Sequence, residues 1–423
     1  MTSELVPPEY AGPNIVNVPG ALQTLLLDMD TIHPFTNQFF AAGLEAGSGV
    51  KNVVLLIVDG LGYGVLDELL PDVAIIPDML GNGTINPIDS IFPTTTAAGI
   101  TALACGKSPK AHGLLEWIIY SKKLDARIHS VLFKRFESKL RDSLADEKIS
   151  IKYLLSQPTL ARWCADNAIS HFTHVSHAIS PSKFSEAVYP GTKPIRFQNS
   201  SDMSVNLRRT FANKAWPDKS LHVVYWGDYD SIAHEHGPTS EQALEDLRQL
   251  FRILYDNWIK LMDRRLAAET ALLIVADHGQ IDVNPETVTY LKRHKKIKAL
   301  LKRHADGKTP ILPWGSPRDV FLAVQKDKIP EMKKLLARMF GDKADIIESR
   351  YALEQGWFGA EPSMHKEFLS RIGDLIILPR DDAMVWWEDV PTTHFKGMHG
   401  GLSDAERIVP FGTVRVSDLL DGR

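Results

Sequence analysis

Cysteine is scarce in this sequence, because its 423 residues include only Cys105 and Cys164. Two cysteines exclude a disulfide framework and a zinc site built from several thiolates. Long hydrophobic runs are also missing, since the apolar stretch Val53–Val58 is far shorter than the roughly 20 residues of a membrane-spanning helix. The N-terminus, MTSELVPPEYAGPN, lacks the charged-then-apolar layout of an export signal. We therefore expect a cytoplasmic protein with no membrane span.

No charge of one sign dominates the chain either. The formal net charge of −4 gives no support to a nucleic-acid scaffold, which is expected to be strongly basic. Hydrophobic residues, in contrast, make up 44% of the chain, which is enough for a large core. The length allows two or three domains, or one large α/β unit with an insertion. The sequence does not indicate an oligomeric state.

Short β-branched and aliphatic runs, bounded by Gly, Asp or Pro, are typical of buried parallel strands. Five such runs are Asn52–Gly60, Leu221–Asp228, Ala271–Gly279, Arg318–Gln325 and Gly373–Pro379. Helical stretches separate them, and between Thr239 and Glu269 apolar residues recur at helical spacing: Leu244, Leu247, Phe251, Leu254, Trp258 and Leu261. This alternation predicts an α/β fold whose mainly parallel sheet is covered by helices on both faces.

Two stretches interrupt the alternation. Residues 121–216 are mixed polar and aromatic, and only Ile169–Ser176 is typical of a strand. Residues 284–394 begin with a basic segment, Tyr290–His304. We therefore expect a core of residues 1–283 and 395–423 with an insertion at about 121–216, and a cap region at 284–394 that includes late core strands.

The basic segment allows two interpretations. It could steer an anionic substrate by its charge. It could instead be the solvated face of a cap helix whose apolar residues Val288, Leu291, Leu300 and Leu301 turn inward. The helical spacing of its leucines favours the second interpretation.

Side chains that can bind metals follow three of the predicted strands. Asp59 comes directly after Val53–Val58, and Asp277 and His278 follow Leu272–Ala276. After Val223–Trp226 come Asp228, Asp230, His234 and His236. Any one of these could be an ordinary turn or cap residue. Ligands of an open parallel sheet lie beyond the carboxyl ends of its strands. Because three strands each place such residues at that one edge, a metal site is favoured.

Near the C-terminus, the segment THFKGMHGGLSDAE places His399 in a loop flanked by glycines. Glycine allows a close approach of the backbone to a ligand or ion. His399 is therefore a candidate for a further metal-binding imidazole.

Three consecutive threonines stand where a helix is expected to begin, in SIFPTTTAAGITALACG (Ser90–Gly106). Threonine is a mediocre helix former but a good residue for a helix start, where its hydroxyl accepts backbone N–H groups. One threonine is enough for a cap. Either all three shape and cap the turn, or one of them has a chemical task.

In this order, the motifs resemble the alkaline phosphatase superfamily, and most closely its type I phosphodiesterase/nucleotide pyrophosphatase branch. The similarity runs from Asn52 to about Glu406 through VVLLIVDGL, FPTTTAAGITALACGKSPKAHGL, DYDSIAHEHGP, VADHG and HGG. It implies an alkaline-phosphatase-like three-layer sandwich with an inserted cap subdomain. The insertion and the cap are not covered by the resemblance.

The resemblance also implies two divalent metal ions. One would be held by Asp230, His234 and His399, and the other by Asp59, Asp277, His278 and the oxygen of the nucleophile. Such nitrogen and oxygen donors suit zinc, with manganese or iron as alternatives. The family's nucleophile lies ten residues before the glycine that matches Gly106, which selects Thr96, with Thr95 as the second choice.

The function implied is a two-metal hydrolase of phosphate esters, most directly a phosphodiesterase/nucleotide pyrophosphatase that acts through a phosphothreonine. Its substrate would be a small phosphate- or phosphonate-containing molecule. Alternatives are a phosphonate hydrolase of the phosphonoacetate type, a phosphomonoesterase, a relative of the serine-using mutases and a catalytically silent metal-binding interaction protein. One departure concerns substrate binding, because Glu116-Trp117 stands where nucleotide pyrophosphatases carry an asparagine.

Overall fold

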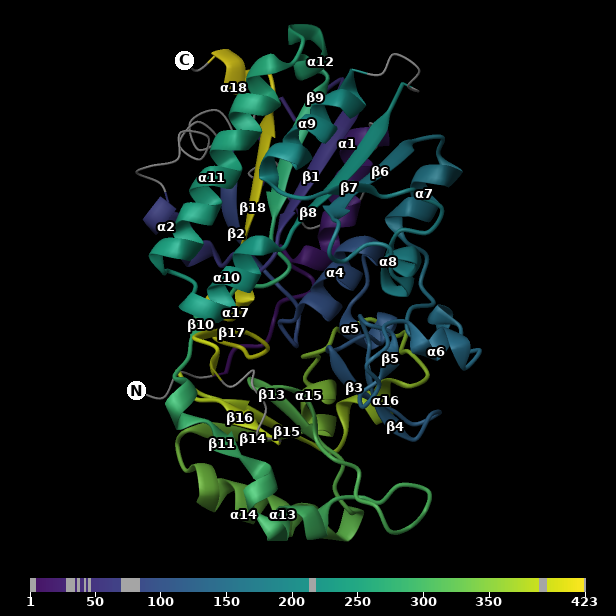
Figure 1. Ribbon diagram of the computed structural model, residues 1–423, viewed down its shortest axis with the longest axis vertical. Coiled ribbons are helices and arrows are strands. Elements are labelled where there is room, and N and C mark those ends of the chain that lie inside the picture. The colour runs from purple at the N-terminus through teal and green to yellow at the C-terminus, as the bar shows by residue number, and fades with distance from the viewer. Residues whose placement is uncertain are drawn as a thin grey trace.

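The computed structural model describes residues 5–27, 35, 39–41, 43–44, 47–69, 84–212, 218–387 and 394–421. Residues 213–217, around the end of the expected insertion, and residues 388–393, near the end of the expected cap, lie outside the described residues. A seven-stranded sheet occupies the upper part of Figure 1, and a four-stranded sheet occupies the lower part. No described helix is both long and apolar enough to pass through a bilayer.

The seven-stranded sheet confirms the predicted parallel arrangement. Its order is β2 (Thr84–Asp89), β18 (Ile408–Arg415), β9 (Thr270–Val275), β1 (Asn52–Val58), β8 (Ser220–Trp226), β6 (Ser170–Ser176), β7 (Ile195–Phe197). The exception is β18, which runs antiparallel to both of its neighbours. In register, Ile57 of β1 lies between Tyr225 of β8 and Val275 of β9, so these three strands end at the same edge.

Helices cover both faces of this sheet, as expected for a three-layer sandwich. Every residue of β1 and β9 is buried, which requires protein on both sides. One connected group of helices is α1 (Val18–Leu27), α4 (Thr96–Cys105) and α7 (Leu160–Asp166). A second group is α9 (Ser200–Phe211), α10 (Asp228–His236) and α11 (Glu241–Asn257). The expected α/β sandwich of a mainly parallel sheet between two layers of helices is therefore confirmed.

The remaining helices are short, apart from one in the lower part of the molecule. They are α2 (Leu66–Leu69), α5 (Pro109–His112), α6 (Ser143–Asp146), α8 (Lys183–Val188), α12 (Arg264–Ala268), α13 (Lys295–Leu300), α14 (Ile329–Phe340), α15 (Ser349–Glu354), α16 (Phe368–Ile372), α17 (Asp404–Arg407) and α18 (Asp418–Asp421). The longer one, α14, packs against α13 and the edge strand β14 (Ala344–Glu348).

The predicted helical stretch Thr239–Glu269 is helical but is not one continuous helix. The helix α11 begins after the cap residue Ser240 and ends at Asn257. Asp263 then accepts hydrogen bonds from two backbone N–H groups and starts the separate helix α12. These side-chain hydrogen bonds favour the start of a new helix at this point over continuation of α11. Leu261, which belongs to the predicted apolar pattern, lies in the break between the two helices and is exposed.

Two of the five predicted strands are not parallel members of the main sheet. The runs around β13 (Asp319–Leu322) and β15 (Leu375–Pro379) lie in an antiparallel sheet with β12 (Trp314–Ser316) and β14 (Ala344–Glu348). Alternate residues of β13 and β15 pack into two different hydrophobic clusters, so this sheet is also buried on both faces. A strand buried on both faces is apolar throughout in either arrangement, which is why the sequence did not separate them.

Three small sheets complete the described structure. They are β3 (Ile118–Ser121), β4 (Ala126–His129) and β5 (Lys134–Arg135), then β10 (Ile281–Asp282) with β17 (Gly397–Met398), and β11 (Thr289–Tyr290) with β16 (Val385–Trp386). In the basic segment, Leu291, Leu300 and Leu301 are buried, four lysines are exposed, and Lys302 is half-buried and paired with Asp374. This burial agrees with the solvated-face interpretation, but Val288 is only half-buried, and the segment divides into β11, a 3-10 turn and the short helix α13.

Candidate metal centre and active site

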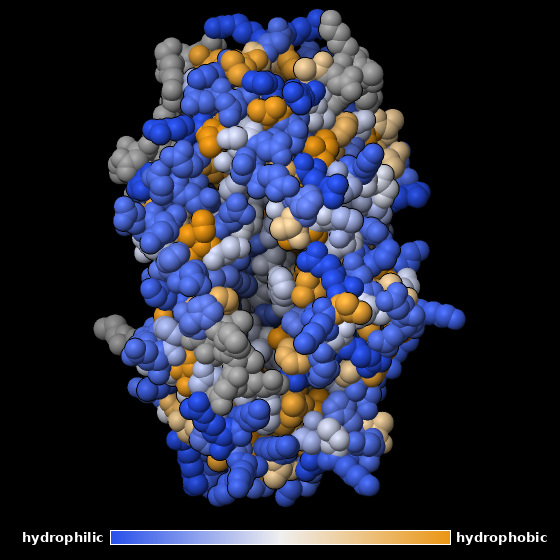
Figure 2. Space-filling view, in the orientation of Figure 1, coloured by the Kyte–Doolittle hydropathy of each residue, from blue (hydrophilic) through white to orange (hydrophobic). Residues whose placement is uncertain are grey.

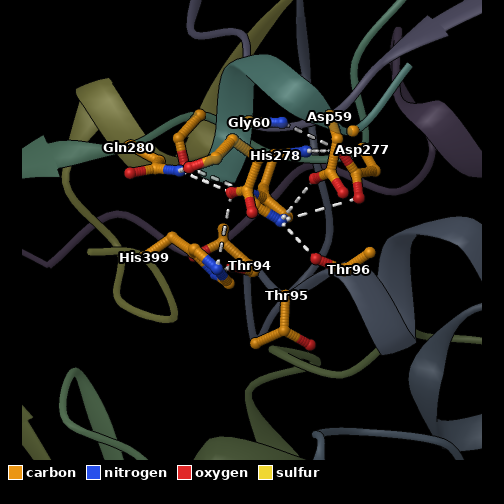
Figure 3. Close-up of polar contacts among 12 residues, drawn as sticks. Asp59, Gly60, Thr94, Thr95, Thr96, Asp277, His278, Gln280 and His399 are labelled. Atoms are coloured by element: carbon orange, nitrogen blue, oxygen red, sulfur yellow. Dashed lines mark hydrogen bonds and ion pairs between the residues drawn. The ribbon is translucent and has the colours of Figure 1, made fainter. Parts of the chain in front are cut away.

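The ends of three neighbouring strands build one half of the site. Asp59 follows β1, Asp277 and His278 follow β9, and Asp230 lies in the first turn of α10 after β8. Because β8, β1 and β9 are adjacent and parallel, these side chains converge at one edge of the sheet, and Figure 3 shows Asp59, Asp277 and His278 side by side there. Asp59, Asp277 and His278 are buried, and Asp230 is nearly so.

The other half comes from a helix turn and a distant loop. His234 lies one turn after Asp230 on α10, with 3.5 Å between His234 Nε2 and Asp230 Oδ2. His399 directly follows β17, which pairs with β10, and β10 itself comes shortly after His278. His399 Nε2 is thereby 3.9 Å from Asp230 Oδ1, although the two residues are far apart in sequence.

Two sets of three ligand atoms are close enough for one ion each. The first is Asp230, His234 and His399, and the second is Asp59, Asp230 and His278. Asp230 thus belongs to both sets, whereas the resemblance assigned it to only one ion. Asp277 lies beside the second set, with its Oδ2 3.6 Å from His278 Nε2. All seven candidate residues, including Thr96, are brought together, while Asp228 and His236 belong to neither set.

The three histidines all present the same ring nitrogen to the centre. The Nδ1 atoms of His234, His278 and His399 lie 2.8, 3.0 and 2.9 Å from the carbonyl oxygens of Gly397, Gly279 and Thr94. A carbonyl oxygen only accepts hydrogen bonds, so Nδ1 carries the proton in each ring. Each Nε2 therefore has a free lone pair directed at the carboxylates, which is the arrangement of a metal-ligating histidine.

The charge balance of the centre also fits bound cations. Within the described residues, no lysine or arginine forms an ion pair with Asp59, Asp230 or Asp277. Burial, together with the charges of Asp277 and Asp230, raises the pKa of Asp59 well above its usual range. Burial likewise raises the pKa of Asp277, and it lowers the pKa of His399 beside the other imidazoles. Asp59 Oδ1 and Asp277 Oδ2 are buried without accepting a hydrogen bond, so both are available to a metal ion.

The three threonines have three different positions. Thr94 donates to the Gly401 carbonyl and accepts from the Gly400 N–H, and so holds the loop of His399. Thr95 is the N-cap of α4, with its buried hydroxyl accepting from Ala98 N–H and donating to the Leu115 carbonyl. The Thr96 hydroxyl lies 3.1 Å from His278 Nε2 and points into the centre, whereas that of Thr95 points away (Figure 3).

Glycine is required at two places behind these ligands. A Cβ atom on Gly99 of α4 would lie 2.7 Å from Asp277 Cβ, so the small residue lets the helix approach the aspartate. Gly60, which follows Asp59, has a φ of +76°, and its Cβ would lie 3.0 Å from Asp230 Oδ1. Gly99 therefore makes room for Asp277, and Gly60 makes room for Asp230.

Two residues that hold the ligands were missed by the sequence analysis. The Tyr225 hydroxyl donates to Asp59 Oδ2, and the Gln280 side chain donates to both Asp230 Oδ1 and the Asp230 carbonyl. Tyr225 is part of an apolar strand pattern, and Gln280 comes two residues after His278. Their positions next to metal-capable residues were the available signal, but only the fold shows which way they point.

Replacing Gln280 with alanine is expected to weaken metal binding by about 10- to 100-fold, because Asp230 loses the donor that orients its carboxylate. Competition with a chromogenic chelator measures this affinity. The control is Gln249→Ala on α11, where the amide donates only to the exposed Glu245. An unchanged affinity in Gln280→Ala would remove this residue from the metal centre.

The Glu116-Trp117 pair is divided between two environments. Glu116 is only 2% exposed and interacts with buried Asp319 and with Ser316, so it does not face a substrate. Burial raises the pKa of Glu116 to about 7, and burial with the Glu116 charge raises the pKa of Asp319 well above its usual range. Trp117, in contrast, is 39% exposed and lines a cavity beside Thr96.

The raised pKa of Glu116 predicts a pH-dependent stability. Between its ordinary pKa of 4.5 and about 7, the folded protein keeps a proton that the unfolded chain loses, so folding stability falls as pH rises through this window. Glu116→Gln removes the effect, which is on the order of 3 kcal/mol. Urea unfolding at pH 5 and pH 8 should show a smaller pH dependence in this variant than in wild type or in the exposed control Glu137→Gln. Identical pH profiles for all three proteins would contradict the assignment.

A cavity of about 100 Å³ lies against Thr96 and Tyr225. Most of its walls come from the predicted insertion and are aliphatic or aromatic: Val131, Leu132, Val175, Ile179, Phe184 and Tyr189. Figure 2 shows this side of the molecule hollowed at mid-height, between α10 and α8 as placed in Figure 1. Side chains between Val131 and Tyr189 therefore form most of an apolar pocket beside the candidate nucleophile.

The fold and the donor set define an α/β protein with a candidate two-metal centre at one edge of a parallel sheet. Residues 53–402 match the family described as type I phosphodiesterase / nucleotide pyrophosphatase, and the chain belongs to this family. The resemblance drawn from the motifs is thus confirmed.

Curated relatives are distant, and the first of them is much longer than this chain. Venom phosphodiesterase CdcPDE of Crotalus durissus collilineatus is 23% identical over 270 residues, which is 60% of this chain and 29% of the relative. Ectonucleotide pyrophosphatase/phosphodiesterase family member 7 of Rattus norvegicus is 25% identical over 99 residues, or 23% of each protein. The matches span less than a third of the length of these relatives.

Solved structures share the fold over most of the chain. Murine ectonucleotide pyrophosphatase / phosphodiesterase 5 superposes with a TM-score of 0.61 at 16% identity, covering 86% of this chain and 87% of its own. Phosphonoacetate hydrolase from Sinorhizobium meliloti 1021, in complex with phosphonoacetate, superposes with a TM-score of 0.59 at 13% identity, covering 87% and 93%. At such identities the likeness concerns the fold alone.

Proposed function

We propose that this protein is a phosphoric ester hydrolase that uses two divalent metal ions, and that its preferred substrates are phosphodiesters. The observation that carries the proposal is the convergence of three carboxylates, three imidazole Nε2 atoms and the Thr96 hydroxyl at one edge of the sheet. Membership of the type I phosphodiesterase / nucleotide pyrophosphatase family supports the same activity.

The donor set divides into two halves. Asp230, His234 and His399 would hold one ion, and Asp59, Asp277 and His278 with Thr96 would hold the other, with Asp230 close to both. Nitrogen and oxygen donors in low number suit zinc, while manganese and iron are compatible. Bound divalent ions would supply positive charge that stabilises a deprotonated hydroxyl and the oxygens of a phosphoryl group.

Thr96 would be the nucleophile. It is the first residue of α4, so the positive end of the helix dipole and the free N–H groups of the first turn face an arriving phosphate. Thr96 Oγ1 gives its proton to solvent and bonds to phosphorus, and the bond from phosphorus to the leaving oxygen breaks. The leaving oxygen keeps the electron pair, takes a proton from solvent and is released as an alcohol. A water oxygen then bonds to phosphorus, the bond from phosphorus to Thr96 Oγ1 breaks, and one water proton goes to Thr96 Oγ1 and the other to solvent, which releases a phosphate monoester and regenerates the threonine.

The apolar cavity beside Thr96 favours a diester over a monoester. In an in-line displacement the leaving group departs from the side opposite the nucleophile. A pocket lined by Thr96 itself therefore accommodates an organic group that remains on phosphorus after the leaving oxygen has departed. A monoester has no such group.

The proposal is tested by supplying the zinc- or manganese-loaded protein with three substrates: bis-p-nitrophenyl phosphate, p-nitrophenyl phosphate and phosphonoacetate. We expect the highest kcat/KM for the diester. A preference for phosphonoacetate would instead identify a phosphonate hydrolase, and a preference for p-nitrophenyl phosphate would identify a monoesterase. Failure to turn over any of them with two ions bound would favour a non-catalytic interaction protein.

A further inference from the structure

The cavity beside Thr96 has one charged side chain among its lining residues, Arg141. Arg141 precedes α6 and is exposed although it lines the cavity, as is expected of a residue at the mouth of a cavity. Within the described residues, Arg141 has no carboxylate partner, whereas nearby Lys183 pairs with Glu186 at 2.8 Å. Arg141 is therefore a cation available to a ligand.

The rest of the cavity limits the kind of group that reaches Arg141. Its volume of about 100 Å³ is of the order that holds one small ring, since an apolar cavity of about 150 Å³ binds benzene. Aromatic surface comes from Trp117, Phe184, Tyr189 and Tyr225, and aliphatic side chains with two serine hydroxyls complete the walls. A compact, flat, apolar group would fill this space with its far end directed to the mouth.

We propose that Arg141 is a specificity-determining residue that selects phosphodiesters whose retained ester group carries a second anion. This inference rests on the proposed function, because it concerns the group that stays on phosphorus. The substrate class is an aryl or short-chain phosphodiester with a carboxylate or phosphate at the end remote from the reacting phosphorus. The planar guanidinium group of arginine matches both anions with two parallel hydrogen bonds.

The test compares two diesters that differ only in charge: 4-carboxyphenyl p-nitrophenyl phosphate and its 4-carbamoylphenyl analogue. Both release p-nitrophenol, and carboxylate and carboxamide have nearly the same shape. For the wild type we expect kcat/KM to be about tenfold higher for the carboxylate, the size of one charge-assisted hydrogen bond at a partly exposed site. In Arg141→Gln this ratio should fall close to one, and Arg141→Lys should keep part of it.

The control is Lys139→Gln, which removes the same charge two residues away from a side chain that does not line the cavity. It should keep the wild-type ratio, because Lys139 does not line the cavity and a charge that does not contact the ligand is largely screened at physiological ionic strength. A ratio near one in the wild type, or an equal loss in both glutamine variants, would overturn the proposal.

A binding measurement separates this inference from the proposed function. Calorimetry on zinc-loaded Thr96→Ala gives the Kd of both diesters without turnover. Tighter binding of the carboxylate ester that is lost in the Thr96→Ala/Arg141→Gln double variant supports the role of Arg141. Equal binding of the two esters overturns it. Absence of turnover in the wild type would count against the hydrolase alone, because the binding comparison still decides the role of Arg141.

Discussion

Replacing Thr96 with alanine is expected to abolish phosphoryl transfer, with kcat reduced by a factor on the order of 10⁴ or more, because the variant lacks the attacking oxygen. The metal content should stay near two ions per chain, since six side-chain ligands remain. Steady-state kinetics with bis-p-nitrophenyl phosphate and elemental analysis of the same preparation measure both quantities. Thr96→Ser, which keeps a hydroxyl at this position, should retain measurable activity.

Thr95→Ala is the matched control for this experiment. Its hydroxyl caps α4 and contacts the Leu115 carbonyl, so its loss should cost about 1 kcal/mol of folding stability while phosphoryl transfer continues. Activity retained in Thr96→Ala but lost in Thr95→Ala would move the nucleophile by one residue. Activity retained in both variants would contradict a mechanism in which a threonine hydroxyl attacks phosphorus.

Replacing Asp230 with alanine is expected to remove both metal ions and to reduce kcat/KM by at least about 10³-fold, because this residue belongs to both candidate ligand sets. His234→Ala should lose only one ion, since His234 contributes to a single set. Elemental analysis after gel filtration should therefore give about two ions per chain for the wild type, one for His234→Ala and none for Asp230→Ala.

Asp228→Ala provides the control for the metal count. Asp228 lies in the same first turn of α10 but belongs to neither ligand set among the described residues. Its replacement should leave two ions bound. Two ions retained in Asp230→Ala would contradict the claim that Asp230 contributes to both ligand sets. An equal loss of ions from Asp228→Ala would contradict it as well.

The sequence was sufficient to predict the centre where ligands directly follow strands. Asp59, Asp277 and His278 come immediately after apolar runs, and parallel neighbours must bring such residues to one edge. Asp230 and His234 are one helical turn apart, which fixes their common side. For His399 the sequence offered only a glycine-flanked loop, and its place in the centre depended on the family resemblance.

Features that depend on side-chain direction or on long-range pairing could not be predicted in this way. Gln280 supports Asp230, and Tyr225 supports Asp59, through hydrogen bonds that no local pattern encodes. Glu116 turns toward Asp319 while its neighbour Trp117 lines the cavity, a division that only the packed structure shows. The antiparallel pairing of β13 with β15 was hidden because burial on both faces removes the polar alternation.

The central claim is that two metal ions bind beside Thr96 at the ends of β1, β8 and β9. Anomalous diffraction at the zinc absorption edge, from crystals of the zinc-loaded protein, tests it most directly. We predict two peaks, one bounded by Asp230, His234 and His399 and the other by Asp59, His278 and Thr96. A single peak, or peaks remote from these side chains, would contradict the account.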